Sequence, residues 1–268
     1  MSTHTDGQVV ATAAEIYDEF FVPALFQGWT SRVADVAALQ PGERVLDVAC
    51  GTGILACEAA ERVGPDGEVI GLDINDGMLT VARRKNNAIA WRQGDAEDLP
   101  FADNTFDAVV SQFGLMFFAD RQLALREMAR VLRPGGRLAV AVWDCVEHVE
   151  GYPPLADLLE RLYGAEVGAA VRSPFVLGNP DLLTGLFADV DGFDNIELHH
   201  QTSTMRFPSM HAWLTTEIRG WVLADRLDDA QFTALLHEAQ PILAPYVQPD
   251  GTVALRAPAY IVSASKAK

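Results

Sequence analysis

The sequence is poor in the features that mark secreted, membrane-spanning and nucleic-acid-binding proteins. Its three cysteines form no Cys-x-x-Cys pair, so neither a disulfide framework nor a zinc site is indicated. No apolar run approaches the length of a membrane span, and the first ten residues lack the basic and apolar regions of a signal peptide. A formal net charge of −17, with only one basic run at residues 83–85, repels nucleic acid phosphates. We therefore expect a cytoplasmic protein that contacts neither nucleic acid nor a membrane.

What the chain does have is enough apolar sequence for one sizeable core. Its 268 residues are 49% hydrophobic, which suits a single α/β domain with a cap. The patterns divide that domain into five parts. These are an N-terminal helical cap at 1–40, a central core at 41–144, helices and a strand at 145–207, an insertion at 208–250 and a last strand at 251–268.

The most informative stretch is Val45–Gly53, where an apolar run ends in a glycine-rich turn. Ile54–Val63 then follows a helical pattern, so the segment predicts a buried parallel strand, a tight loop and a helix N-terminus. Gly51 and Gly53 permit backbone angles and close ligand approach that a Cβ would forbid. The helix start offers free N–H groups to an anionic group. The stretch therefore predicts a cradle for a small molecule.

Two kinds of cofactor use such a cradle. The spacing Gly51-x-Gly53-x-x-Ala56 fits the dinucleotide fingerprint. Asp47 argues against a dinucleotide, because a carboxylate inside the strand sits badly beside a pyrophosphate and suits a ligand with an ammonium and a sulfonium. The run DVACGTG at residues 47–53 resembles the first motif of class I S-adenosylmethionine (SAM) dependent methyltransferases. That resemblance assigns SAM contacts to this run, including Ala49 and Thr52.

The second predicted strand, Glu68–Asp73, also ends in an acid. Asp73 stands 20 residues beyond Gly53, where a carboxylate can accept hydrogen bonds from ribose hydroxyls. This placement serves NAD and SAM alike. The methyltransferase resemblance implies that Ile74 and Met78 pack against the adenine ring, although an ordinary core position is an equal reading for Met78.

A third short strand, Ile89–Gln93, leads into GDAEDLPF at residues 94–101. This run resembles the next methyltransferase motif. An acid can accept from the exocyclic amine of adenine while a neighbouring backbone N–H meets a ring nitrogen. We expect Asp95 and Ala96 to have these two roles.

The fourth predicted strand, Phe106–Ser111, is followed at once by an aromatic loop. Ligands of open α/β sheets lie just outside the carboxyl ends of the strands. We therefore expect Ser111 and Gln112 to contact the cofactor. The acceptor would be contacted by Phe113, Met116 and Phe117.

The segment Ala11–Phe26 has a helical pattern with Ile16 and Phe20 on its inner face, and Pro23 predicts a break or kink. The segment and the residues after it are unusually aromatic, with Tyr17, Phe21, Phe26 and Trp29. We expect Tyr17, Phe21 and Phe26 to contact the acceptor, and a helix that only packs on the core is an equal reading.

The resemblance, which covers residues 41–144, implies an α/β fold with a doubly wound, mostly parallel, Rossmann-like seven-stranded sheet. Its last two strands, Ile196–Phe207 and Thr252–Ser263, would run as an antiparallel pair. Pro258 would sit at a bulge, because proline removes a ladder bond. The insertion Pro208–Asp250 would form a lid over the acceptor, and the alternative is extra core or a dimer interface.

Taken with the resemblance, these patterns indicate an enzyme that moves a methyl group from SAM to a small, partly apolar acceptor by in-line displacement. Such a reaction needs positioning and exclusion of water more than a diagnostic catalytic residue. His148 is the best placed candidate for a base, ahead of His199, His200, His211 and Glu217, and no metal site is expected. The acceptor atom stays open, as does the choice between monomer and homodimer. The alternatives are a nicotinamide-dependent oxidoreductase and a SAM-binding protein without transferase activity.

Overall fold

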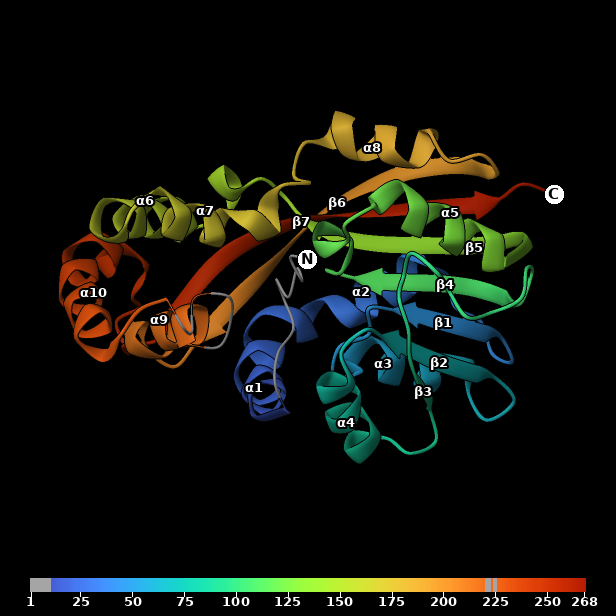
Figure 1. The fold of residues 1–268 in the computed structure, drawn as a ribbon, viewed down its shortest axis with the longest axis horizontal. Coiled ribbons are helices and arrows are strands. Elements are labelled where there is room, and N and C mark those ends of the chain that lie inside the picture. Colours follow the sequence, from blue (N-terminus) through green and yellow to red (C-terminus); the bar gives the residue numbers. More distant parts are fainter. Residues whose placement is uncertain (1–10, 220–222, 224–225) are drawn as a thin grey trace, which may run out of the picture.

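The computed structural model describes residues 11–219, 223 and 226–268, and within them it contains one seven-stranded sheet of order β3-β2-β1-β4-β5-β7-β6. All neighbours pair in parallel except β7, which runs antiparallel to both β5 and β6 (Figure 1). The doubly wound, Rossmann-like sheet expected from the sequence is thus confirmed. The strands are β1 Arg44–Val48, β2 Glu68–Asp73, β3 Ala90–Gln93, β4 Phe106–Gln112, β5 Leu132–Trp143, β6 Phe193–Phe207 and β7 Val253–Lys266.

Helices cover both faces of this sheet, as the right-handed crossovers require. From β1 the chain adds β2 and β3 toward one edge of the sheet, and from β4 it adds β5 toward the other edge. Because the direction reverses, the crossover helices of the two halves lie on opposite faces of the sheet. Those of the first half pack with α2, and α5 packs with α8 (Figure 1). These helices are α2 Thr30–Val36, α3 Ile54–Val63, α4 Asp76–Lys85, α5 Arg121–Val131 and α8 Pro180–Ala188.

The central strands are buried on both faces, which explains their continuous apolar runs. Val45 and Leu46 in β1 and Val109 and Val110 in β4 have no exposed surface. Because the strand order reverses between β1 and β4, the connections that leave the carboxyl ends of these two strands go to opposite faces of the sheet. A crevice at this switch point is where ligands of such sheets bind.

The N-terminal segment differs from the expected α-helix. Only α1, Ala11–Ile16, is α-helical, and a π-helix, η1, continues through Tyr17–Phe26 before the short 3-10 turn η2, Gln27–Trp29. Each π turn holds more residues than an α turn. The buried positions therefore shift to Phe21 and its neighbours, while Ile16 and Phe20 are 41% and 49% exposed. The inner face predicted from the 3.6-residue period was wrong for that reason.

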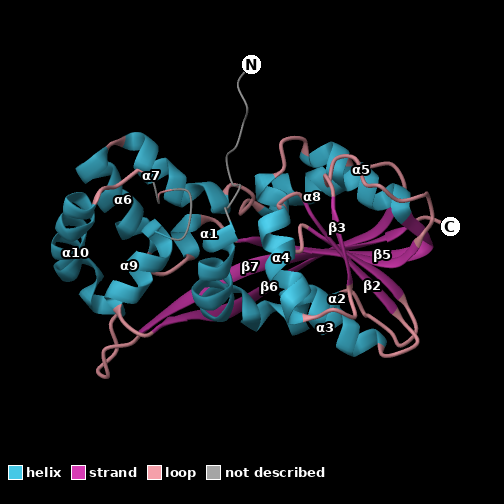
Figure 2. Ribbon diagram, turned by 60° about the horizontal axis from the view of Figure 1, so that its bottom comes forward, coloured by secondary structure: helices cyan, strands magenta, loops and turns pink. Residues whose placement is uncertain are grey.

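A second group of helices forms a lobe beyond the carboxyl ends of the parallel strands, along the projecting half of β6 and β7 (Figures 1 and 2). These cap helices are α6 Tyr152–Tyr163, α7 Ala165–Arg172, α9 Met210–Arg219 and α10 Asp229–Leu243. They pack on one another and bury Trp213 completely. Short 3-10 turns complete the fold at η3 Leu115–Phe117, η4 Val146–His148, η5 Ser173–Phe175 and η6 Ala244–Tyr246.

Pro258 does not lie at a bulge, contrary to the expectation from the sequence. Thr202 pairs with it in an uninterrupted register, and the shift between β6 and β7 falls at Asp194/Glu197 instead. The Pro258 carbonyl accepts from the Asp144 amide just past the end of β5. Since the N–H and C=O of one residue in an antiparallel strand point to the same side, the missing N–H faces the end of β5 and costs β6 no bond.

None of the described helices combines the length and the apolar character needed to cross a bilayer.

Candidate functional site

A small cavity of about 30 Å³ opens at the switch point between β1 and β4. Its floor is the loop after β1 and the start of α3, one wall is Gln112 at the end of β4, and the N-terminal helix covers it. The sequence motif and the aromatic N-terminal segment, through Tyr17 and Phe26, therefore meet at one site. The lining residues are Tyr17, Val22, Phe26, Asp47, Ala49, Cys50, Gly51, Thr52, Ile54, Leu55 and Gln112.

The loop after β1 depends on left-handed backbone at three positions, with φ of 57° at Ala49, 54° at Gly51 and 84° at Gly53. Gly53 is the N-cap of α3 and offers no side-chain cap to the helix N–H groups. A Cβ on Gly53 would also come within 2.3 Å of the Trp91 ring. Glycine is thus required there by both conformation and space, and the uncapped helix start is free to meet an anionic group.

Asp47 is the most unusual side chain of the cavity. It is 1% exposed, and neither carboxylate oxygen makes a hydrogen bond of good geometry among the described residues. Burial raises the pKa of this carboxyl well above its usual range, the nearby Asp73 carboxylate raises it further, and the backbone N–H of Ala56 opposes the rise. An unpaired acid in such a place costs free energy unless a ligand supplies donors. The site therefore fits a cationic or hydrogen-bond-donating group at Asp47.

Asp73 lies at the end of β2, next to this loop. One carboxylate oxygen accepts from the Gly51 amide and the other from the Asn75 amide, both at 2.8 Å. Burial raises the pKa of Asp73, and these two hydrogen bonds oppose the rise. The carboxylate keeps lone pairs for further donors, so it holds the glycine loop in place and can still accept from a ligand.

The residues predicted to surround the adenine ring differ from one another in their exposure. Ile74 is 51% exposed at the end of β2, whereas Met78 is buried in a small cluster with Ala14 and Val81 below the N-terminal helix. Asp95, in the loop after β3, is exposed and accepts from the Glu97 amide. The neighbouring Ala96 is 7% exposed. Met78 thus has a clear packing role, and the part of each in ligand binding stays a prediction.

The end of β4 presents two polar side chains. Ser111 is fully buried, and its hydroxyl has no hydrogen-bond partner among the described residues. Gln112 donates through Nε2 to the Phe26 carbonyl at 3.2 Å, while its Oε1 atom has no partner within the described chain. Gln112 therefore ties the N-terminal helix to the edge of the sheet beside the cavity.

Aromatic rings form a continuous layer above this edge. Tyr17 stacks on Phe26, with ring centroids 5.5 Å apart, and Phe26 contacts Phe113 at 5.7 Å. Phe113 in turn stacks on Trp143 at 3.9 Å. Phe21 stacks on Tyr17 but is completely buried. We refer to Tyr17, Phe26, Phe113 and Trp143 as the aromatic layer.

Two of the residues predicted to meet the acceptor lie differently. Met116 is 4% exposed within the core cluster, and Phe117 is 44% exposed on η3. Trp143, the end residue of β5, completes the aromatic layer but was not singled out from the sequence. Its position at the carboxyl end of the fifth strand was the signal that could have identified it, because ligands of such sheets lie just outside these ends.

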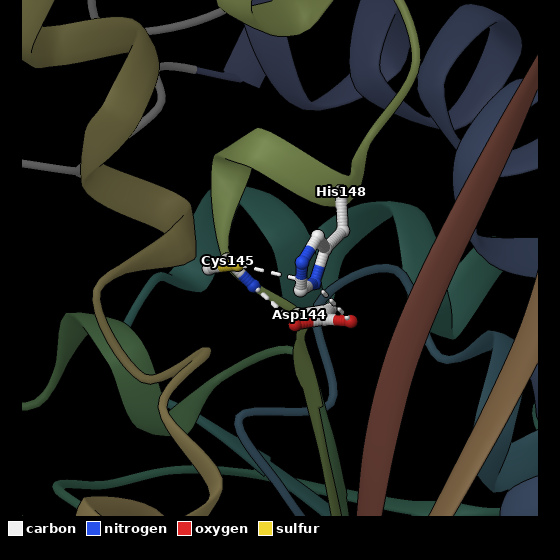
Figure 3. A group of neighbouring side chains, drawn as sticks. All are labelled: Asp144, Cys145 and His148. Atoms are coloured by element: carbon white, nitrogen blue, oxygen red, sulfur yellow. Dashed lines mark hydrogen bonds and ion pairs between the residues drawn. The ribbon is translucent and has the colours of Figure 1, made fainter.

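His148 lies with Asp144 rather than at the cavity (Figure 3). Its Nδ1 atom is 3.1 Å from one carboxylate oxygen of Asp144 and 3.2 Å from the sulfur of Cys145, and His200 Nε2 is 2.9 Å from the same carboxylate oxygen. Burial raises the pKa of Asp144, but the Cys145 amide and the histidines outweigh it, so the pKa is lowered. This hydrogen bonding accounts for the cluster, although three of its side chains could in principle hold a metal ion.

A second cavity of about 30 Å³ lies between the aromatic layer and the cap helices. Tyr152 from α6 and Glu217 from α9 meet in it, with the Tyr152 hydroxyl donating to a Glu217 carboxylate oxygen at 2.5 Å. Glu217 had stood out only weakly in the sequence, and Tyr152 not at all. They are 65 residues apart, so no local spacing could have joined them.

Comparison with known proteins supports the motif analysis. A family model described as a methyltransferase domain matches residues 46–140. A ubiquinone/menaquinone biosynthesis C-methyltransferase, UbiE, from Teredinibacter turnerae is 38% identical over 160 residues, which cover 58% of this chain and 61% of the relative. The UbiE of Klebsiella pneumoniae strain 342 is 33% identical over 218 residues, covering 72% and 83%.

The chain spans about three fifths of the length of several curated relatives, such as the 61% of the first of these. Among solved structures, phosphoethanolamine N-methyltransferase 2 of Haemonchus contortus, crystallised with S-adenosyl-L-methionine, superposes with a TM-score of 0.61. It is 18% identical, and the match covers 97% of this chain and 58% of that one. At this identity the likeness concerns the fold.

Proposed function

The chain belongs to the class I S-adenosylmethionine-dependent methyltransferases, and from that premise we propose that it transfers a methyl group to a small, partly apolar acceptor. The observation that carries the proposal is Asp47, a buried carboxylate in the cavity at the switch point that no side chain pairs and that only the backbone N–H of Ala56 approaches. This side chain suits the ammonium of SAM and is unfavourable beside a pyrophosphate. We expect the protein to act in the cytoplasm as a monomer or homodimer.

The proposed contacts with SAM run from the cavity to the ends of β2 and β3. Asp47 would accept from the ammonium, and the uncapped start of α3 behind Gly51, Thr52 and Gly53 would meet the carboxylate. Asp73 would accept from the ribose hydroxyls. For the adenine, Asp95 and Ala96 would supply an acceptor and a backbone N–H, with Ile74 and Met78 beside the ring. Ala49, Ser111 and Gln112 would complete the cofactor contacts.

When bound, SAM supplies a methyl group already activated by its positively charged sulfur. The chain must therefore hold the acceptor atom in line with that group and keep water out. The aromatic layer suits this purpose, because Phe26, Phe113 and Trp143 are buried and because the layer reaches the SAM cavity through Tyr17 and Phe26. We infer that the acceptor lies against these rings, with Tyr17, Phe21, Phe26, Phe113, Met116 and Phe117 as the residues proposed to surround it, whereas His148 lies with Asp144 and is not part of this set.

The acceptor is best described by its chemistry. An apolar surface of rings favours a molecule with a large apolar part, and a net charge of −17 disfavours phosphorylated or polyanionic molecules. The relatives named above carry C-methylation and ubiquinone or menaquinone biosynthesis in their names. A partly apolar ring acceptor agrees with both considerations.

Isothermal titration calorimetry tests the cofactor assignment directly. SAM and its demethylated product should bind, whereas NAD and NADP should not. Comparable binding of a nicotinamide cofactor would favour an oxidoreductase instead. Conversion of SAM to S-adenosylhomocysteine over a panel of small apolar acceptors then separates a transferase from a SAM-binding protein without activity.

A further inference from the structure

The second cavity lies directly behind the SAM cavity. Leu25 lines one and the next residue, Phe26, lines the other. Trp143 lines the second cavity and also belongs to the aromatic layer, 6.2 Å from Phe26 between ring centroids. The two cavities are therefore separated by a single layer of side chains. The second cavity is lined by Leu25, Trp143, Tyr152, Ala170, Val171, Pro174, Phe175, Met205, Glu217 and Leu223.

This lining is apolar except for one strong hydrogen-bonding group. Glu217 and Tyr152 are the only ionisable side chains among the described residues that line the cavity. Tyr152 is 3% exposed and packs edge-on against Phe175, with ring centroids 5.2 Å apart. A leucine at position 217 would be cheaper for folding, because an acid in apolar surroundings is costly. Such a group beside a cavity is more often retained for binding or catalysis.

The geometry leaves Glu217 able to bind a ligand. Tyr152 donates one hydrogen bond to Oε1 and fixes the orientation of the carboxyl group. A carboxylate has about four acceptor positions, so further donors can be accommodated. Burial raises the pKa of Glu217 to about 7, which places its ionisation close to neutral pH. The pair is therefore a positioned acceptor in a cavity of about 30 Å³, which admits a small polar group and leaves the ring that carries this group outside.

We propose that this second cavity binds the polar end of the acceptor, and that Glu217, oriented by Tyr152, accepts a hydrogen bond from a hydroxyl or amino group there. The inference rests on the proposed methyltransferase function and adds a substrate class to it. The acceptor is an uncharged, mainly apolar molecule with at least one O–H or N–H group. Glu217 is then a specificity-determining residue and Tyr152 a positioning residue.

Three probes of nearly equal size test this without any methyl donor. Phenol carries an O–H donor, aniline carries N–H donors, and fluorobenzene carries neither. Calorimetry on the wild-type protein should show phenol or aniline binding about tenfold more tightly than fluorobenzene, which corresponds to one hydrogen bond to a charged group. The probe of these two that binds more tightly shows whether the site prefers an O–H or an N–H donor. Equal binding of all three probes would overturn the proposal.

Glu217→Gln is the decisive variant, because it keeps the shape and replaces part of the acceptor by an NH₂ donor. It should bind phenol, aniline and fluorobenzene within about twofold of one another. A matched control is Glu166→Gln, whose side chain is 89% exposed on α7, and it should retain the wild-type preference. If Glu217→Gln keeps a tenfold preference for the donor-bearing probes, Glu217 is not their partner.

Tyr152→Phe tests the positioning role separately. The variant should bind phenol and aniline several-fold more weakly than the wild type does, with the affinity for fluorobenzene unchanged. Unaltered binding of phenol and aniline would contradict the positioning role. The phenol affinity of the wild type should also rise with pH through about 7 and be flat in Glu217→Gln. Circular dichroism of each variant establishes that it is folded. Since no probe needs SAM, failure here is distinguishable from failure of SAM to bind.

Discussion

At the scale of single residues, Asp47 couples ligand binding to stability. Its carboxylate is buried beside the SAM cavity and makes no hydrogen bond of good geometry in the described chain. Such a group destabilises the ligand-free protein and gains most from a cationic ligand. The Asp47 carboxylate should therefore lower the stability of the ligand-free protein and strengthen the binding of SAM.

Asp47→Asn should separate these two effects. We expect the ligand-free variant to be more stable by about 1–3 kcal/mol at neutral pH, because the charge is removed from an apolar site. SAM should bind at least about tenfold more weakly, through loss of the charged partner. Denaturant unfolding and calorimetry give the two values. The exposed Asp66→Asn is the control, and equal effects of the two variants would contradict the role of Asp47.

Substitution of Asp73 is expected to have the opposite effect on the stability of the ligand-free protein. Asp73→Ala should weaken SAM binding by roughly 1.5–3 kcal/mol. It should also destabilise the ligand-free protein by about 1–3 kcal/mol, because the Gly51 and Asn75 amides lose their acceptor. Asp73→Asn keeps one acceptor oxygen and should recover part of the stability. Thermal unfolding without ligand measures this. A fully stable Asp73→Ala protein would mean that the loop holds its shape without the carboxylate.

Glu217 gives a pH dependence whose sign follows from its raised pKa. The unfolded group ionises near 4.5 and the folded group near about 7, so between these values the folded state keeps a proton that the unfolded state has released. Its contribution to stability is thus lost as the pH rises through this window and is constant above it. The unfolding free energy of Glu217→Gln should therefore gain on that of the wild type as the pH rises. The difference between the two should increase by roughly 2–3 kcal/mol from pH 4.5 to about 7. A pH-independent difference would mean that Glu217 ionises normally.

The candidate site was only partly predictable at this scale. The run at residues 47–53 and Asp73 could be recognised because their roles depend on local sequence, at the ends of successive parallel strands. The pairing of Tyr152 with Glu217 could not, because it depends on how two cap helices cross. His148 lies away from the SAM cavity because it bonds to Asp144, whose orientation just past the end of β5 the sequence does not encode locally.

At the scale of elements, the sheet followed from the sequence better than the N-terminal helix did. Apolar runs, turn residues and the glycine loop located β1 and β2 to within a residue or two, because burial on both faces leaves a continuous apolar signal. The π-helix η1 could not be recognised, since its period differs from the 3.6 residues assumed for Ala11–Phe26. The consequence was that Ile16 and Phe20 were placed on the wrong face.

The N-terminal helix and the insertion at 208–250 are both candidates for a gate over the site. Tyr17 and Phe26 cover the SAM cavity, and ion pairs between Asp18 and Lys85 and between Glu15 and Arg84 tie the helix to α4. The described residues of the insertion instead pack much of their apolar surface within the cap. Gates commonly order when ligand binds.

Hydrogen exchange distinguishes the two gates. Addition of S-adenosylhomocysteine should increase protection at residues 13–26, and an acceptor should add protection at 210–219, while β1 exchanges slowly throughout. Asp18→Asn should accelerate loss of S-adenosylhomocysteine about two- to fivefold, as expected for one partly exposed ion pair. Ligand-independent protection of both segments would show that neither is a gate.

At the scale of the whole molecule, the charge of −17 acts on stability as well as on partner choice. Like charges repel most strongly in the compact state, and salt screens them within about 10 Å at 0.1 M. The melting temperature should therefore rise by a few degrees as NaCl increases from about 0.01 to 0.2 M. Sucrose at matched osmolality, which does not screen charge, is the control. An unchanged or falling melting temperature would mean that local ion pairs outweigh the net repulsion.

The position of β7 has a consequence for the order in which the chain can fold. Val253–Lys266 pairs with β5 on one side and β6 on the other, so the sheet stays divided until this segment has left the ribosome. Until then β5 and β6 each present an unpaired edge, and open edges invite pairing with other chains. The nascent protein thus completes its SAM-binding half early but passes through an aggregation-prone stage, when assistance from a chaperone would have the greatest effect on yield.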